Sequence, residues 1–61
     1  MVQLSEKELS ALHELLAEEE LLVKKFKMLA QHAEDQQIKN QMESIAEKHQ
    51  GHFNMLYKQL G

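Results

Sequence analysis

The sequence predicts an all-α protein, an antiparallel two-helix hairpin that pairs with a second copy to make a four-helix bundle. Leu, Glu, Lys, Gln and Ala dominate the 61 residues, proline is absent and glycine occurs twice, which is typical of helical proteins. Apolar residues recur every three or four positions in two stretches separated by a polar break. A domain this short, without cysteine, buries too little surface for comfortable stability alone. We therefore expect one domain, residues 1–61, that forms a homodimer.

The first helix is predicted to run from about residue 6 to about residue 32. Ser5 can accept hydrogen bonds from free backbone N–H groups, and Glu8 three residues later completes a capping box. Leu4 and Leu9 are spaced for a hydrophobic staple. The apolar stripe of this helix is Leu9, Leu12, Leu16, Val23, Phe26, Ala30 and Ala33, widened by Leu15, Leu22 and Leu29. A face this broad requires at least two neighbouring helices.

A turn at about residues 33–35 separates this helix from the second, which is predicted for about residues 36–59. Asp35 is the expected N-cap, and its negative charge suits the positive end of the helix dipole. The stripe of the second helix is Ile38, Met42, Ile45, His49, Phe53, Leu56 and Leu60. Both stripes contain a polar residue where the pattern calls for an apolar one, Glu19 in the first and His49 in the second.

In a hairpin that turns near residue 34, opposed positions have numbers that add up to about 68. This register places apolar residues opposite apolar residues along the length of both helices. It also places Glu19 opposite His49, in the middle of the hairpin. The sequence therefore predicts that an inward carboxylate meets an inward imidazole.

Glu19 and His49 are the candidate metal ligands. Dinuclear carboxylate bundles use a lone Glu from one helix and Glu-x-x-His from the next, because the i, i+3 spacing directs both side chains at one point. Here Ala46 occupies the carboxylate position before His49, and Glu47 lies one step round the helix. A symmetric dimer could still assemble two copies of Glu19 and His49 around one zinc-like divalent ion. Two other interpretations stay open: the pair satisfies itself without metal, or Glu19 lies at a solvated boundary.

His52 follows His49 at i+3, a spacing that can chelate one ion on a helix surface. We expect His52 instead to flank the core near Leu16 and to cover it in part. His13 and His32 are expected on the surface.

Charge and composition exclude several classes of function. The net charge is −3 and arginine is absent, which counts against nucleic-acid binding. No segment reaches the length of a membrane span, and the N-terminus lacks the pattern of a signal peptide, so a cytoplasmic protein is expected. Without cysteine or a positioned base beside a serine, nucleophilic catalysis has no support, and we expect a non-enzymatic protein with no required cofactor.

Two segments resemble the spore coat protein F family of endospore-forming bacteria. These are residues 19–25, Glu-Glu-Leu-Leu-Val-Lys-Lys, and residues 45–53, which end in His-Gln-Gly-His-Phe. The His-x-x-His-Phe element is the most specific part of the resemblance. The resemblance implies a ferritin-like four-helix bundle, a structural or assembly role, a location in the forespore or spore coat, and other coat proteins as partners. Longer relatives carry both hairpins in one chain, so dimerisation would supply the second hairpin here.

Overall fold

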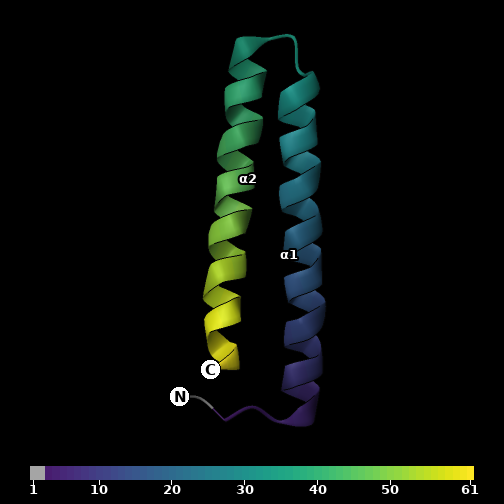
Figure 1. Cartoon of the computed structure of the whole chain (residues 1–61), viewed down its shortest axis with the longest axis vertical. Coiled ribbons are helices and arrows are strands. Elements are labelled where there is room, and N and C mark those ends of the chain that lie inside the picture. The colour runs from purple at the N-terminus through teal and green to yellow at the C-terminus, as the bar shows by residue number, and fades with distance from the viewer. Residues whose placement is uncertain (1–2) are drawn as a thin grey trace.

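The computed structural model describes residues 3–61 as two long antiparallel helices. Helix α1 spans Glu6–His32 and helix α2 spans Gln36–Tyr57, followed by the short 3₁₀-helix η1 at Lys58–Leu60. The helices lie side by side, joined by a tight connection at one end, with the start of α1 and the end of η1 at the other (Figure 1). The predicted all-helical hairpin is thereby confirmed.

The start of α1 is held by the predicted capping box. The Ser5 hydroxyl accepts a hydrogen bond from the Glu8 backbone N–H at 3.1 Å, and the Ser5 backbone N–H donates to the Glu8 carboxylate at 2.9 Å. The hydrogen bond from the Ser5 backbone N–H, and after it the Ser5 side chain, lower the pKa of the exposed Glu8 carboxyl, because hydrogen bonding to a carboxylate favours its charged form. The reciprocal bonds satisfy donors that a helix start otherwise leaves free.

The connection between the helices begins at Ala33, where the backbone becomes extended, and ends at the N-cap Asp35. The Asp35 carboxylate accepts hydrogen bonds from the backbone N–H groups of Gln37 at 2.7 Å and Ile38 at 3.1 Å. Asp35 therefore starts α2 as predicted. The turn at residues 33–35 sets the register between the two helices.

The end of α2 differs from the expected helix to about residue 59. The α-helical geometry ends at Tyr57, and the last turn tightens into η1, where Gly61 donates its N–H to the Lys58 carbonyl at 3.2 Å. Such tightening is a common way for the final carbonyl groups of a helix to find partners. The Gly61 φ of 116° lies in the region that favours glycine.

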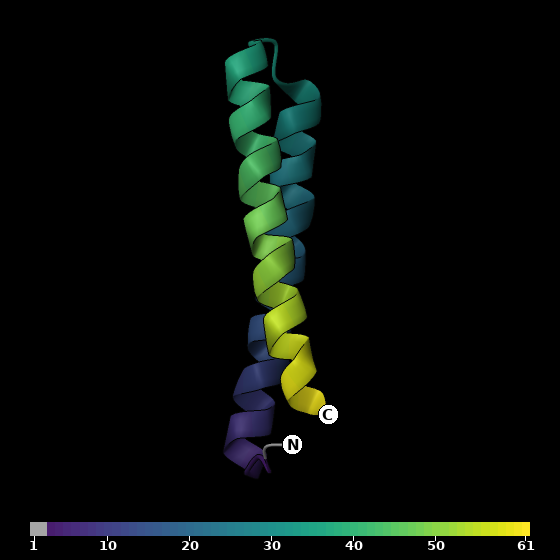
Figure 2. The same cartoon turned by 90° about the vertical axis from the view of Figure 1, so that its left-hand side faces the viewer.

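The core is a narrow seam between the helices. Its buried apolar residues within residues 3–61 are Leu12, Leu16, Val23 and Ala30 of α1 and Ala46 of α2. The Cα positions span 45 × 17 × 10 Å, so the hairpin is one helix thick (Figure 2). Each helix consequently has one neighbour, and both sides of the layer are open.

The two sides of the layer differ in chemistry. One side carries two shallow grooves whose rims are charged or polar, with Val23, Ala46 and Phe53 also in their lining; the charged and polar residues are Glu20, Lys24 and Lys27 of α1 and Glu43, Glu47 and Gln50 of α2. We call this side the polar face. Each residue of an α-helix is turned by about 100° relative to the one before it. Lys24 directly follows the buried Val23 and Glu47 directly follows the buried Ala46, so in both helices the residue after a buried one lies on this face.

A step backward of about 100° from the buried residues leads to the opposite side, which we call the apolar face. On α1, Leu15, Leu22 and Leu29 directly precede the buried Leu16, Val23 and Ala30. On α2, Ile45 precedes Ala46, and Ile38 and His52 lie seven residues before and after Ile45. Leu15 is 45 %, Leu29 53 % and Ile38 46 % exposed, so this broad apolar surface lacks a partner within the hairpin.

Candidate functional site

Glu19 of α1 and His49 of α2 meet across the hairpin, as the register predicted. His49 Nδ1 lies 2.6 Å from Glu19 Oε1, in a hydrogen bond whose two side chains are only 23 % and 15 % exposed. Glu19 follows the buried Leu16 by three residues, and His49 follows the buried Ala46 by three. Three residues amount to about 300° of rotation, which turns both side chains from the seam toward the apolar face.

His52 joins this pair, which the sequence reasoning did not predict. Its Nδ1 lies 3.1 Å from Glu19 Oε2, the second oxygen of the same carboxylate. The expectation that His52 flanks the core near Leu16 is therefore replaced by a contact with Glu19. The cause is that a carboxylate has two oxygen atoms and can contact two imidazoles that are one helical turn apart. The i, i+3 spacing of the two histidines was the available signal.

Aromatic packing fixes the orientation of the His49 ring. Phe26 of α1 stacks on His49, with ring centroids 5.6 Å apart and planes inclined by 13°. His49 and His52 meet edge to face at 5.5 Å and 86°. His49 is thus clamped between an aromatic ring, a second imidazole and a carboxylate, whereas the His52 side chain is 55 % exposed and freer to turn. A packed aromatic neighbour that holds a ligand in place is a feature of preorganised sites.

Both carboxylate oxygens of Glu19 have an imidazole partner, and the Glu19 side chain is only 15 % exposed. No buried side-chain nitrogen or oxygen within residues 3–61 lacks a hydrogen-bond partner. Glu19 therefore does not lie at the solvated boundary that one interpretation placed it at. The self-satisfied pair and the metal site both remain compatible with this geometry, because a ligand atom that accepts or donates a hydrogen bond can exchange it for a metal bond.

The three residues Glu19, His49 and His52 have the composition and spacing of a metal-ligand cluster. Each offers one ligand atom such that all three atoms lie within 4.8 Å of one another. The Glu-x-x-His carboxylate of a dinuclear site has no counterpart here, because Ala46 is only 2 % exposed in the seam and Glu47 lines the polar face. The cluster therefore provides ligands for one ion.

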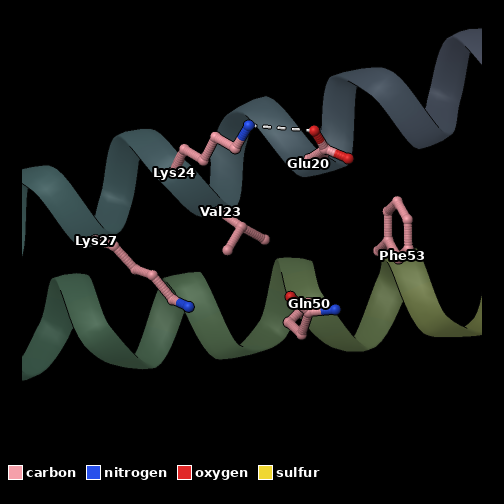
Figure 3. Close-up of a pocket in the computed structure, with 6 residues that line it drawn as sticks. All are labelled: Glu20, Val23, Lys24, Lys27, Gln50 and Phe53. Carbon is pink, nitrogen blue, oxygen red and sulfur yellow. Dashed lines mark hydrogen bonds and ion pairs between the residues drawn. The ribbon is translucent and has the colours of Figure 1, made fainter.

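The polar face bears the marks of an ordinary solvated surface. Figure 3 shows Glu20, Lys24 and Lys27 above Gln50 and Phe53, with the Glu20–Lys24 pair 3.2 Å apart. Both side chains of this i, i+4 pair are more than half exposed, at 58 % and 70 %, and such pairs add little stability. The remaining histidines, His13 and His32, are exposed as expected.

The chain matches no protein-family model, no curated protein and no solved structure. Within residues 3–61, neither helix contains a stretch that is long and apolar enough to cross a membrane.

Proposed function

We propose that the protein is a non-enzymatic structural or assembly protein that acts as a homodimeric, ferritin-like four-helix bundle. The observation that carries this proposal is the apolar face. Leu15, Leu22 and Leu29 recur every seven residues along α1, on the side where Ile38 and Ile45 lie on α2. Large contiguous apolar surfaces of this kind mark interaction sites.

A second copy of the chain is the occupant that suits this face best. The face runs along both helices of a hairpin that is one helix thick, so a second hairpin laid on it gives every helix a second neighbour. A two-fold axis uses the same surface on both copies, which needs no further partner sequence. Full burial of an exposed leucine side chain contributes about 1.5 to 3 kcal/mol, and Leu15 and Leu29 are still about half exposed in the hairpin, so each would add roughly half of that amount.

Sedimentation of two double variants tests the dimer. Leu15→Gln with Leu29→Gln removes two residues of the apolar face, whereas Leu21→Gln with Met28→Gln removes two equally exposed residues, 51 % and 56 %, from the outer side of α1. Glutamine is a good helix former and carries no charge, so helicity and net charge stay comparable.

The wild type and the outer-side variant should sediment with twice the chain mass at micromolar concentration. The apolar-face variant should dissociate, with a Kd raised by at least about 100-fold, since four leucines per dimer are lost. A monomeric wild type, or a dimer that only the outer-side variant breaks, contradicts the proposed interface.

The spore-coat part of the proposal is supported by the resemblance of residues 19–25 and 45–53 to the spore coat protein F family. The structure adds that the family-like His-x-x-His-Phe element lies on α2 with both histidines directed at Glu19. We propose that the dimer is deposited in the forespore or spore coat, together with other coat proteins.

Metal binding is the second candidate function, favoured by the 2.6 Å contact between Glu19 and His49. In this proposal a divalent ion replaces the hydrogen bond between the two side chains, and two copies of the pair in a dimer supply four ligands to one shared ion. The function would be storage or structural stabilisation, because the carboxylate of a dinuclear oxidase site is replaced by the buried Ala46.

A further inference from the structure

We infer that Glu19, His49 and His52 of a single chain form a mononuclear site for a borderline divalent cation such as zinc, with one coordination position left open. The inference rests on the second candidate function, metal binding, and names its ligand set, its metal class and its stoichiometry. It differs from the shared site in that all three protein ligands come from one hairpin.

The geometry requires only small movements of the side chains. Two ligands bound to zinc at about 2.0 to 2.1 Å in a tetrahedron lie about 3.3 Å apart. His49 Nδ1 lies 2.6 Å from Oε1 of Glu19 and His52 Nδ1 lies 3.1 Å from Oε2, and one ligand atom from each of the three residues lies within 4.8 Å of the others. His52 is the most exposed of the three and can rotate toward the ion, while stacking against Phe26 keeps His49 in place.

The donor set selects the class of metal. Two imidazoles and one carboxylate suit zinc, cobalt, nickel and copper, whereas calcium and magnesium require more oxygen ligands. Three protein ligands fill three corners of a tetrahedron, and the fourth is left for water or an added ligand. The i, i+3 pair of histidines on α2 faces a carboxylate on α1, so the ion would also cross-link the two helices halfway along the hairpin.

The stoichiometry separates the two metal proposals. A site built from Glu19, His49 and His52 of one chain binds one ion per chain. A site built from two copies of Glu19 and His49 binds one ion per two chains, and His52 has no part in it.

The inference is tested by titrating the untagged protein with zinc in the presence of a competing chelator and measuring the heat of binding by calorimetry. His52→Gln removes the third ligand, Glu19→Gln removes the negative ligand while preserving shape, and His13→Gln is the matched control because it removes an exposed histidine of α1 outside the cluster. Circular dichroism confirms that each variant keeps its helicity. Cobalt substitution adds a second readout, since a tetrahedral site with nitrogen and oxygen ligands gives intense visible absorption.

We expect about one zinc ion per chain, a tetrahedral cobalt spectrum, and affinity in His13→Gln equal to that of the wild type. His52→Gln and Glu19→Gln should each weaken zinc binding by at least about tenfold, because even outer-shell partners of a metal contribute about 10- to 100-fold. If calcium or magnesium binds with an affinity similar to that of zinc, the assigned metal class is contradicted.

Half an ion per chain together with unchanged affinity in His52→Gln overturns the three-ligand site and leaves the shared Glu19 and His49 site standing. Absence of zinc binding in the wild type overturns both metal proposals. The dimer proposal is judged separately, by sedimentation of the same samples in a chelator.

Discussion

At the scale of single residues, the centre of the hairpin is organised around the Glu19 carboxylate. Its two oxygens contact two different histidines, His49 at 2.6 Å and His52 at 3.1 Å. An unpaired carboxylate at 15 % exposure would be costly, so each imidazole relieves part of the desolvation of Glu19. The contacts are unequal, because His49 is held between the helices and His52 is largely in solvent.

This arrangement predicts an asymmetric double-mutant cycle for Glu19 and His49. His49→Leu leaves Glu19 with His52 as a partner and should cost on the order of 1 kcal/mol, whereas removal of Glu19 deprives both histidines and should cost more, within about 1 to 3 kcal/mol. The double change to leucine should cost less than the sum of the single changes, because the middle of the hairpin becomes apolar.

Urea denaturation at fixed protein concentration, in a chelator, measures the cycle. His52→Leu serves as the comparison, since His52 is 55 % exposed and its loss should affect stability least. If the loss of unfolding free energy in the double variant equals the sum of the losses in the two single variants, the contact between Glu19 and His49 does not stabilise the protein in solution.

At the scale of helices, the ends are defined locally and the middles by packing. The Ser5 and Glu8 box opens α1, and Asp35 opens α2, each through hydrogen bonds that span no more than three residues. Gly51 lies in the interior of α2, and apart from its chain neighbours and the backbone of its own helix no atom lies within 4 Å of the position that an added Cβ would occupy. A glycine inside a helix costs stability unless a close contact requires it.

Gly51→Ala is therefore expected to raise the free energy of unfolding by about 0.4 to 1 kcal/mol. The gain comes from a less flexible unfolded chain and a better helix former, with no new clash within the hairpin. Ala17→Gly, at an exposed position of α1, is the reverse control and should lower stability by a similar amount. Denaturation of both variants at equal concentration provides the measurement. A loss of stability in Gly51→Ala would show that another helix packs closely against this side of α2, contrary to the interface on the apolar face.

At the scale of the whole molecule, the hairpin is a single layer, with Cα positions that span 10 Å in its thinnest direction, and it has one polar and one apolar side. Pairing through the apolar face places Lys24, Lys27 and Glu47 of both copies on the outer surface of the bundle. Glu19, His49 and His52 point toward the apolar face, so the proposed metal site would lie inside such a bundle.

The spore-coat proposal predicts where the protein accumulates. An antibody against the purified protein should detect it in sporulating cells of the source organism and in extracts of the spore coat, and not in vegetative cells. A cytoplasmic protein of similar abundance is the fractionation control. Equal amounts in vegetative cells and none in coat extracts would remove the spore-coat proposal while leaving the dimer intact.

The sequence by itself determined the helices, the caps at Ser5 and Asp35, and the facing of Glu19 and His49. Caps depend on residues three positions apart, and a turn at residues 33–35 leaves one register in which the apolar stripes of the two helices face each other, so local information was sufficient. The last turn of α2 departed from the pattern because a helix end depends on how its final carbonyls find partners, which the apolar stripe does not encode.

Only the tertiary structure decided the place of His52. Its spacing from His49 was visible in the sequence, but its partner depends on how far α2 is rotated about its own axis against α1. If α2 were rotated by a few tens of degrees, the His52 side chain would cover Leu16 and would not contact Glu19. The rotation of α2 is set by the packing of the whole seam, in which Ala46 is buried against α1. The third ligand of the proposed metal site is therefore a product of helix packing, whereas the first two follow from the turn.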